Sequence, residues 1–214
     1  MNRPCRHLVI MAKAPVAGAV KTRLGNGIGV GAATGFYRAA LAGQMRVLGR
    51  DRRWRSWLAV TPDTALGEAF WPPGIARIEQ GKGDLGARMQ RVFDRLPPGP
   101  AVIVGSDIPA IRPRHVAAAF RLLGAADAVF GPAEDGGYWL VGLKRFPRVL
   151  RIFDNVRWSG PHTLADTSRN LENQKAGFLE TLNDIDTADD YRRWQALNMT
   201  GCSKTYPQHR RAGA

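Results

Sequence analysis

Cysteine and histidine are scarce in this sequence of 214 residues. The two cysteines, Cys5 and Cys202, lie close to its two ends, so we expect two free thiols rather than a disulfide or a metal site. The four histidines have no spacing typical of metal ligands and are expected to be structural or solvated. These shortages argue against a disulfide-stapled scaffold and against a zinc centre built from cysteine and histidine.

Long hydrophobic runs are absent as well. No stretch is long enough to span a bilayer, and the apolar residues at 8–11 are too few for the core of a signal peptide. We therefore expect no membrane span and a cytoplasmic location.

Acidic residues are too few to balance the basic ones: 31 Lys and Arg against 18 Asp and Glu give a net charge of +13. Such an excess keeps nucleic-acid binding open as a function. The cations are scattered, however, and neither an aromatic-basic platform nor a known nucleic-acid motif accompanies them. Part of the excess lies in a segment with little apolar content, which predicts a flexible basic tail over 201–214. Nucleic acid is therefore not the expected primary partner.

Hydrophobic residues make up 44% of the sequence, enough for the core of one domain over 1–200. Strand-type and helix-type stretches alternate along it, without an internal repeat or a dividing linker. The densest cluster of Pro and Gly, at 96–100, is short and predicts a sharp loop. This alternation predicts an α/β fold of three layers, an α/β/α sandwich around a mostly parallel sheet.

An apolar, β-branched run, AVIVGSD at 101–107, ends in an aspartate that is followed by Ile108 and Pro109. Such a run fits a strand buried on both faces, and α/β sheets bind ligands at the carboxyl ends of their strands. Asp107 would then meet a metal-bound substrate. A turn aspartate that bonds the backbone before a proline explains this segment equally well.

Another apolar strand, at 8–11, leads into a loop with Gly18 and three cations, Lys13, Lys21 and Arg23. Backbone N–H groups and cationic side chains in such a loop suit a polyphosphate, and the alternative is a solvated basic loop. A Walker loop is excluded because no Gly-Lys-Ser/Thr follows at the required spacing. We attribute the G-x-G-x-x-A match at 27–32 to chance, because it lies well past the strand.

The segment QGKGDLGARM, at 80–89, combines glycines with an acidic residue. Gly83 gives the backbone freedom for a close approach, which suits the wall of a nucleotide pocket. Asp84 can belong to that wall, and it is equally well explained as the N-cap of a helix over 85–96.

In the segment VFGPAEDGGYWLVGL, at 129–143, two apolar strands flank the carboxylates Glu134 and Asp135. The glycines and aromatics beside them suit a polyhydroxylated substrate with a base next to its hydroxyl. A hairpin turn is the competing explanation for Asp135 and Gly136, but turn chemistry does not require Glu134.

A strand-like stretch at 178–182 precedes the acidic segment NDIDTADD. Asp184 and Asp186 occupy alternate positions of an extended stretch, so both can point to one side, and one can share a divalent cation with Asp107. Thr187 and Asp190 have the spacing of a capping box at the start of a helix.

Five motifs in this order resemble the bacterial DUF2064 family of proposed glycosyltransferases, relatives of the molybdenum-cofactor and coenzyme F420 nucleotidyltransferases. The motifs are AKAPVAGAVKTRL, QGKGDLGARM, VIVGSDIPAI, VFGPAEDGGYWLVGL and NDIDTADD. The resemblance implies a GT-A-like, Rossmann-like nucleotide-diphospho-sugar transferase fold, a Mg2+ or Mn2+ ion, and a nucleoside di- or triphosphate donor. By position it places Lys21 and Arg23 at the donor phosphates, Asp107 and Asp186 at the metal, and Glu134, Asp135 and Gly136 near the acceptor.

The predicted site combines this resemblance with the residue patterns. It consists of the catalytic pair Glu134 and Asp135; the donor-binding residues Lys13, Gly18, Lys21, Arg23, Gly83 and Asp84; the acceptor-binding residues Gly136, Gly137 and Tyr138; and the metal ligands Asp107 and Asp186.

Two positions depart from the family pattern. Ala17 stands where the family commonly has proline, and Ser106-Asp107 is not the two-aspartate D-x-D of many glycosyltransferases, so nucleotidyltransferases match equally well. The expected function is metal-dependent transfer from a nucleotide-sugar to a small-molecule acceptor. The alternative is a nucleotidyltransferase acting on a phosphorylated small molecule, and the lesser alternative is a non-catalytic protein that binds nucleotide or nucleic acid.

Overall fold

The computed structural model of the chain describes residues 5–201, with side chains as far as 197. The strands are β1 (His7–Lys13), β2 (Arg55–Thr61), β3 (Ala76–Glu79), β4 (Ala101–Gly105), β5 (Ala128–Pro132), β6 (Tyr138–Leu143) and β7 (Ala176–Phe178). The helices are α1 (Thr22–Ile28), α2 (Val30–Leu48), α3 (Leu85–Arg95), α4 (Pro113–Leu122), α5 (Thr163–Arg169) and α6 (Ala188–Gly201), with a short 3-10 turn at Asp63–Ala65. Beyond residue 201, the predicted basic tail lies outside the described residues.

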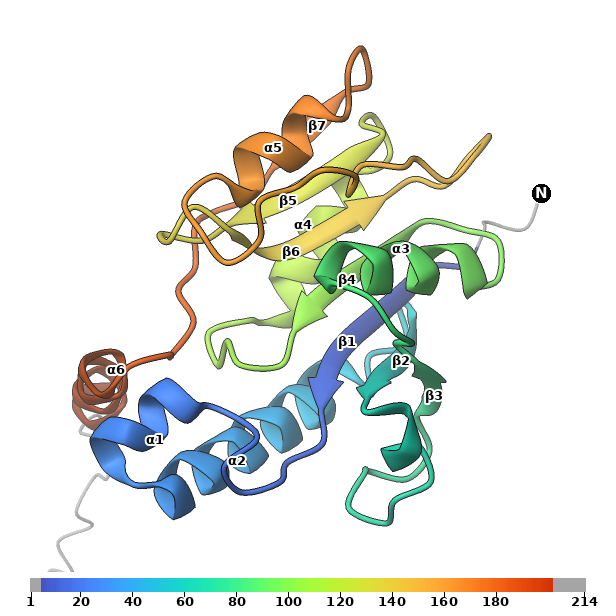
Figure 1. The fold of residues 1–214 in the computed structure, drawn as a ribbon. Coiled ribbons are helices and arrows are strands. Elements are labelled where there is room, and N and C mark those ends of the chain that lie inside the picture. Colours follow the sequence, from blue (N-terminus) through green and yellow to red (C-terminus); the bar gives the residue numbers. More distant parts are fainter. Residues whose placement is uncertain (1–4, 202–214) are drawn as a thin grey trace, which may run out of the picture.

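The strands form one mixed sheet in the order β3-β2-β1-β4-β6-β5-β7 (Figure 1). All neighbours pair in parallel except β6, which runs antiparallel to both β4 and β5. This arrangement confirms the prediction of a mostly parallel sheet. It also means that β1, β2, β3, β4, β5 and β7 all end at the same edge.

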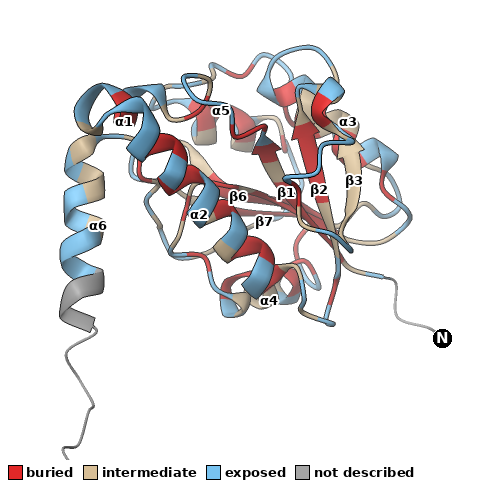
Figure 2. Cartoon of the chain, turned by 90° about the horizontal axis from the view of Figure 1, so that it is seen from below, coloured by how far each residue is buried: buried red, intermediate tan, exposed pale blue. Residues whose placement is uncertain are grey.

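The central strand β4 is buried on both faces, as its apolar run predicts. Val102 and Val104 pack into one hydrophobic core, and Ala101 and Ile103 pack into the other. The first core is covered by α2 and α4, and the second by α3 and α5. Figure 2 shows buried residues in the strands and on the inner sides of these helices, with exposed residues outside. These layers confirm the α/β/α sandwich.

A third, smaller core joins α1, α2 and α6 beyond the end of the sheet. Its buried members are Leu24, Ala33, Phe36 and Ile185, and the ring of Trp194 contacts Phe36 edge-on. A Cβ atom on Gly27 would lie 2.6 Å from the Cβ of Ala188, so this glycine permits the close approach of α1 and α6. The G-x-G-x-x-A match thus lies at a helix contact and not at the first turn after β1.

Most boundaries agree with the sequence patterns, and one differs. Thr187 and Asp190 form the capping box of α6, because each side chain accepts the backbone N–H of the other residue. The strand expected at 178–182 is wrong in its bounds, because β7 covers 176–178 and shares only Phe178 with it. Beyond Phe178, Leu179 and Leu182 each donate one backbone hydrogen bond to a residue of β5, and no continuous ladder forms. Among the described residues, no helix is both long and apolar enough to cross a membrane.

Candidate functional site

A cleft opens where β1 and β4 separate at the carboxyl edge of the sheet. The two strands pair as far as Met11 and Gly105, and beyond that point β1 continues to Lys13 paired with β2 only. The cleft has a volume of about 450 Å³ and is lined by the ends of both strands, the 19–23 loop and Asp186. A crevice of this kind is where open α/β sheets bind ligands.

Three aspartates from two distant parts of the chain come together beside this cleft, and Asp107 and Asp186 line it. Asp107 follows β4, and Asp184 and Asp186 follow β7. One carboxylate oxygen from each lies within 4.8 Å of the others. The alternate positions of Asp184 and Asp186 therefore place both carboxylates on one side, as their spacing predicts. Clustered carboxylate oxygens are the donor set that hard divalent cations such as Mg2+ and Mn2+ prefer.

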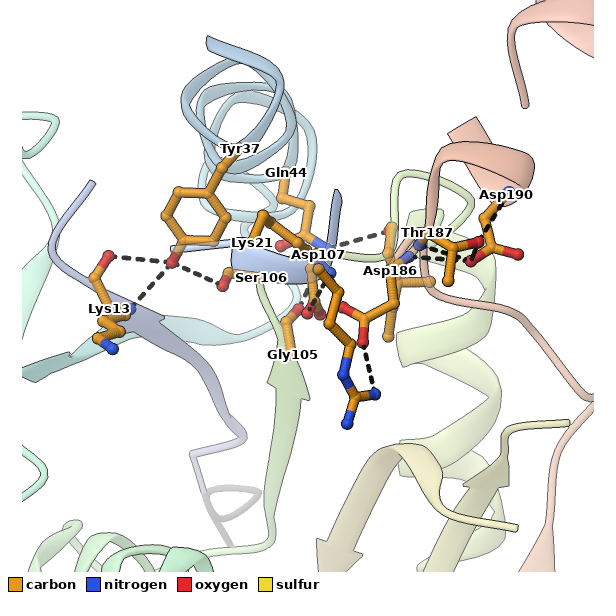
Figure 3. Close-up of polar contacts among 12 residues, drawn as sticks. Lys13, Lys21, Tyr37, Gln44, Gly105, Ser106, Asp107, Asp186, Thr187 and Asp190 are labelled. Carbon is orange, nitrogen blue, oxygen red and sulfur yellow. Dashed lines mark hydrogen bonds and ion pairs between the residues drawn. The ribbon is translucent and has the colours of Figure 1, made fainter. Parts of the chain in front are cut away.

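The ammonium of Lys21 lies between two of these carboxylates (Figure 3). Its Nζ is 3.0 Å from Oδ2 of Asp107 and 2.9 Å from Oδ1 of Asp186, and its side chain is 4% exposed. Burial lowers the pKa of Lys21, but the two adjacent carboxylates outweigh burial and hold that pKa above its usual value. Lys21 is therefore a charged, fixed cation within the cluster.

Asp184 shows how crowded the negative charge is. Burial, followed by the charge of Asp107, raises the pKa of Asp184 to about 6, although Lys21 acts in the opposite direction. The charges of Asp186 and Asp135 contribute to the same rise. Three carboxylates thus face one buried cation, Lys21, and one exposed cation, Arg23, and this arrangement favours an additional cation.

The other predicted donor-binding residues of the first loop lie at or near the cleft. Arg23 is 75% exposed, and its Nη1 is 3.4 Å from Oδ2 of Asp186. The exposed side chain of Lys13 lines the cleft at the end of β1. Gly18 turns the loop with a φ of +76° but does not line the cleft.

Asp84 is the N-cap of α3. Its Oδ1 accepts the backbone N–H of Ala87 at 2.8 Å, and Gly83 precedes it with a φ of +108°. Asp84 borders a separate groove along α3, whereas Leu85 and Arg88 line the cleft itself. The capping interpretation is confirmed, and a contact of Gly83 or Asp84 with a donor stays a prediction.

Glu134 and Asp135 lie at the exposed tip of the hairpin between β5 and β6. Oδ1 of Asp135 accepts the backbone N–H of Gly137 at 2.9 Å, and Gly136 has a φ of +83°, so the turn interpretation is confirmed. The charge of Asp135 also acts on Asp184, which places the tip near the three aspartates. A catalytic role for the two carboxylates stays a prediction.

Tyr138 does not face the cleft. Its ring packs 5.7 Å from that of Phe130, on the side of the sheet covered by α3 and α5. Burial raises the pKa of Tyr138, and neighbouring Thr167 opposes that rise. The predicted contact of Tyr138 with an acceptor stays a prediction that this orientation does not support.

Three polar residues at the ends of β1 and β4 were not predicted as site residues. Tyr37 and Gln44 come from α2 and contact the ends of β1 and β4, and Ser106 precedes Asp107. The helical periodicity of α2 is the signal that could have found two of them, because Tyr37 and Gln44 occupy positions on its buried, mostly apolar face.

The sequence model of the family DUF2064, described as an uncharacterized protein conserved in bacteria, matches residues 44–160, more than half of the chain. The chain belongs to this family. No curated protein matches the sequence significantly. The matched part of this DUF2064 protein includes β4, Asp107 and the hairpin of Glu134 and Asp135.

Solved structures share the whole fold. A candidate nucleotide-diphospho-sugar transferase from Desulfovibrio desulfuricans G20 is 27% identical, with a TM-score of 0.81, over 95% of this chain and 90% of that one. Rv0371c from Mycobacterium tuberculosis H37Rv, in complex with manganese, is 19% identical, with a TM-score of 0.56, over 90% and 98%. The 4-diphosphocytidyl-2C-methyl-D-erythritol synthase from Anaerococcus prevotii DSM 20548 is 10% identical, with a TM-score of 0.61, over 91% and 98%. These similarities confirm the nucleotide-diphospho-sugar transferase type of fold.

Proposed function

We propose that this DUF2064 protein is a metal-dependent transferase that takes a glycosyl group from a nucleotide-sugar and passes it to a small-molecule acceptor. The observation that carries the proposal is the cluster of Asp107, Asp184 and Asp186 around Lys21, at the carboxyl edge of the sheet and beside a cleft. The 27% identical structure, described as a candidate nucleotide-diphospho-sugar transferase, supports the same class of donor.

The donor diphosphate would bind at the first loop. Lys13, Lys21 and Arg23 bring three cationic side chains to the cleft, and charge-assisted hydrogen bonds to phosphate are stronger than neutral ones. Gln80, Leu85 and Arg88 line the cleft as well and would border the rest of the nucleotide.

The three aspartates fit a Mg2+ or Mn2+ ion, because they offer one carboxylate oxygen each within 4.8 Å of one another. Burial, and then the charge of Asp107, raises the pKa of Asp184, so a cation beside its carboxylate would favour the charged form. Such an ion would neutralise charge on the leaving diphosphate. The manganese complex of Rv0371c, which shares the fold, supports a divalent cation in proteins of this shape.

The acceptor would approach from the hairpin tip. Glu134 and Asp135 are exposed there, and a carboxylate beside an acceptor hydroxyl can accept its proton during the attack on the sugar. Gly136 keeps the tip close to the 160–162 segment, since a Cβ atom on it would lie 2.4 Å from the carbonyl oxygen of Pro161.

Nucleotidyl transfer is the second candidate. Gly105 stands two residues before Asp107, where a D-x-D motif would have its first aspartate. The fold is shared with the 4-diphosphocytidyl-2C-methyl-D-erythritol synthase from Anaerococcus prevotii DSM 20548. In that reaction the same aspartates and cations would lie at the α-phosphate of a nucleoside triphosphate.

A thermal-shift screen tests the proposal. Nucleosides, nucleoside di- and triphosphates and nucleotide-sugars are added with and without Mg2+ or Mn2+, and Asp107→Asn serves as the control. At equal ligand concentrations, a nucleotide-sugar with metal should stabilise the wild type most; a ligand present at a hundredfold excess over its own Kd stabilises it by about 2.7 kcal/mol. If no nucleotide stabilises the protein with either metal, the proposed function is wrong.

A further inference from the structure

Two polar side chains project from the buried face of α2. Tyr37 and Gln44 lie about two helical turns apart and are 4% and 5% exposed. The same face also carries Leu41, Met45 and Leu48, which are buried and apolar, and Thr34, whose hydroxyl bonds the Val30 carbonyl of its own helix. A polar side chain in such a position is unfavourable unless it is hydrogen-bonded, so its bonding partners indicate what it is for.

The Tyr37 hydroxyl replaces a missing strand partner. Because β4 pairs with β1 only as far as Gly105, Lys13 has no β4 residue opposite it. The hydroxyl donates to the Lys13 carbonyl at 3.0 Å and accepts the Lys13 N–H at 2.9 Å. It also lies 3.0 Å from Oγ of Ser106. Since the single hydroxyl proton is used on Lys13, Ser106 must be the donor in this last bond. Tyr37 therefore joins the ends of β1 and β4 where they separate (Figure 3).

Gln44 holds the turn that carries Asp107. Its Nε2 donates to the carbonyl oxygens of Gly105 and Ile108, at 3.1 Å each. These two bonds fix the orientation of the amide, because a flipped amide would turn its oxygen toward two carbonyl oxygens. Oε1 of Gln44 is buried without a hydrogen-bond partner among the described residues. Since an orphaned buried acceptor is unfavourable, an apolar residue would serve the packing of α2 better.

We propose that Tyr37 and Gln44 are positioning residues that hold Asp107 in its place for the metal ion and the donor. This inference rests on the proposed function. Ser106 is bonded to Tyr37, and Gly105 and Ile108 are bonded to Gln44, so the residues on both sides of Asp107 are tied to one helix. Ligands keep their geometry when surrounding hydrogen bonds fix them, and loss of such bonds weakens metal sites.

Two variants remove these hydrogen bonds while retaining shape: Tyr37→Phe and Gln44→Met. Trp54→Phe is the matched control, because it removes a buried hydrogen bond from the indole to the Leu48 carbonyl, beyond the opposite end of the same helical face. Each protein is titrated by calorimetry with Mn2+ alone, and then with a nucleoside diphosphate in the presence of Mn2+, well below its unfolding temperature. Both variants should bind Mn2+ about tenfold or more weakly, and Trp54→Phe should bind it like the wild type.

The outcomes separate this inference from the proposed function. If the wild type binds Mn2+ and both variants bind it equally well, the positioning role is overturned and the proposed function stands. If the wild type binds neither Mn2+ nor nucleotide, the proposed function fails and the positioning role fails with it. Ser106→Ala keeps the test decisive should a variant not fold, because it removes one donor only. It should give a smaller but measurable weakening, and unchanged Mn2+ affinity would overturn the role.

Discussion

The buried ammonium of Lys21 lies 3.0 Å from the carboxylate of Asp107, which joins the loop after β1 to the end of β4. The lysine also contacts Asp186, so one side chain connects three segments that are far apart in the sequence. Lys21 thus connects the predicted phosphate-binding loop with Asp107 and Asp186, the predicted metal ligands.

Replacement of Lys21 should separate phosphate recognition from base recognition. Lys21→Met retains much of the side chain but removes the charge, and a charge-assisted hydrogen bond contributes about 1.5–3 kcal/mol. We expect affinity for a nucleoside diphosphate to fall by about tenfold or more and affinity for the nucleoside to change little. Calorimetry with both ligands measures this, and Lys175→Met, exposed just before β7, is the control. If the affinities for nucleoside and nucleoside diphosphate fall equally, the loop shapes the pocket but does not recognise phosphate.

Arg23→Ala should have a weaker effect of the same kind. Its side chain is 75% exposed, so solvent and salt screen its charge more than that of Lys21. The expected loss of diphosphate affinity should shrink as salt is raised, which the same titrations at two ionic strengths would show. A loss that does not depend on salt would contradict an electrostatic role.

Asp107→Asn should abolish the effect of divalent ions on nucleotide binding and leave the fold intact. The substitution keeps the size of the side chain, and the position is one-third exposed, so packing changes little. Calorimetry with and without Mn2+ measures the enhancement, and Asp94→Asn on α3 is the control. Equal metal enhancement in the wild type and Asp107→Asn would rule out Asp107 as a metal ligand.

Asp184 should make stability depend on pH. Its pKa is about 6 in the folded protein, against an ordinary value of 3.8, so the folded state holds the proton more tightly than the unfolded state. The contribution of Asp184 to the free energy of unfolding is therefore fully present below about pH 4 and is lost as the pH rises through about 6. Asp184→Asn lacks this loss, so it should be more stable than the wild type at pH 7 and similar to it at pH 4. Urea unfolding without divalent ions measures the free energy of unfolding at both pH values. An Asp184→Asn variant that is less stable than the wild type at pH 7 would contradict the raised pKa of Asp184.

The hairpin carboxylates should affect turnover more than donor binding. Glu134→Gln and Asp135→Asn each remove a potential base. The amide oxygen that the second substitution introduces can still accept the Gly137 N–H that shapes the turn. We expect lower kcat with an unchanged Kd for the donor. If either variant loses donor affinity in proportion to its activity, that residue belongs to the donor site.

The sequence was sufficient for the features that depend on local pattern. The apolar run before Asp107 predicted a strand buried on both faces, and the alternate spacing of Asp184 and Asp186 predicted two carboxylates on one side. Asp84 and Thr187 were recognisable as helix caps because capping depends on residues within one turn.

The remaining features depend on contacts between distant segments. Tyr37 and Ser106 are 69 positions apart, and only the packing of α2 against the sheet brings the two hydroxyls together. The orientation of Tyr138 follows from the register of β6 within the sheet, since neighbouring residues of a strand face opposite sides. The glycines at 136–137 and the aromatic residue after them do not indicate that register, so the sequence alone could not predict which side of the sheet Tyr138 faces.

The products formed by the purified protein test the central claim most directly. The wild type and Asp107→Asn are incubated with Mn2+ and a set of nucleotide-sugars, or with nucleoside triphosphates and phosphorylated acceptors, and the released nucleoside diphosphate and pyrophosphate are quantified. Glycosyl transfer predicts that the wild type, but not the variant, slowly releases nucleoside diphosphate from one class of nucleotide-sugar. Release of pyrophosphate from a triphosphate, without turnover of any nucleotide-sugar, would contradict that account.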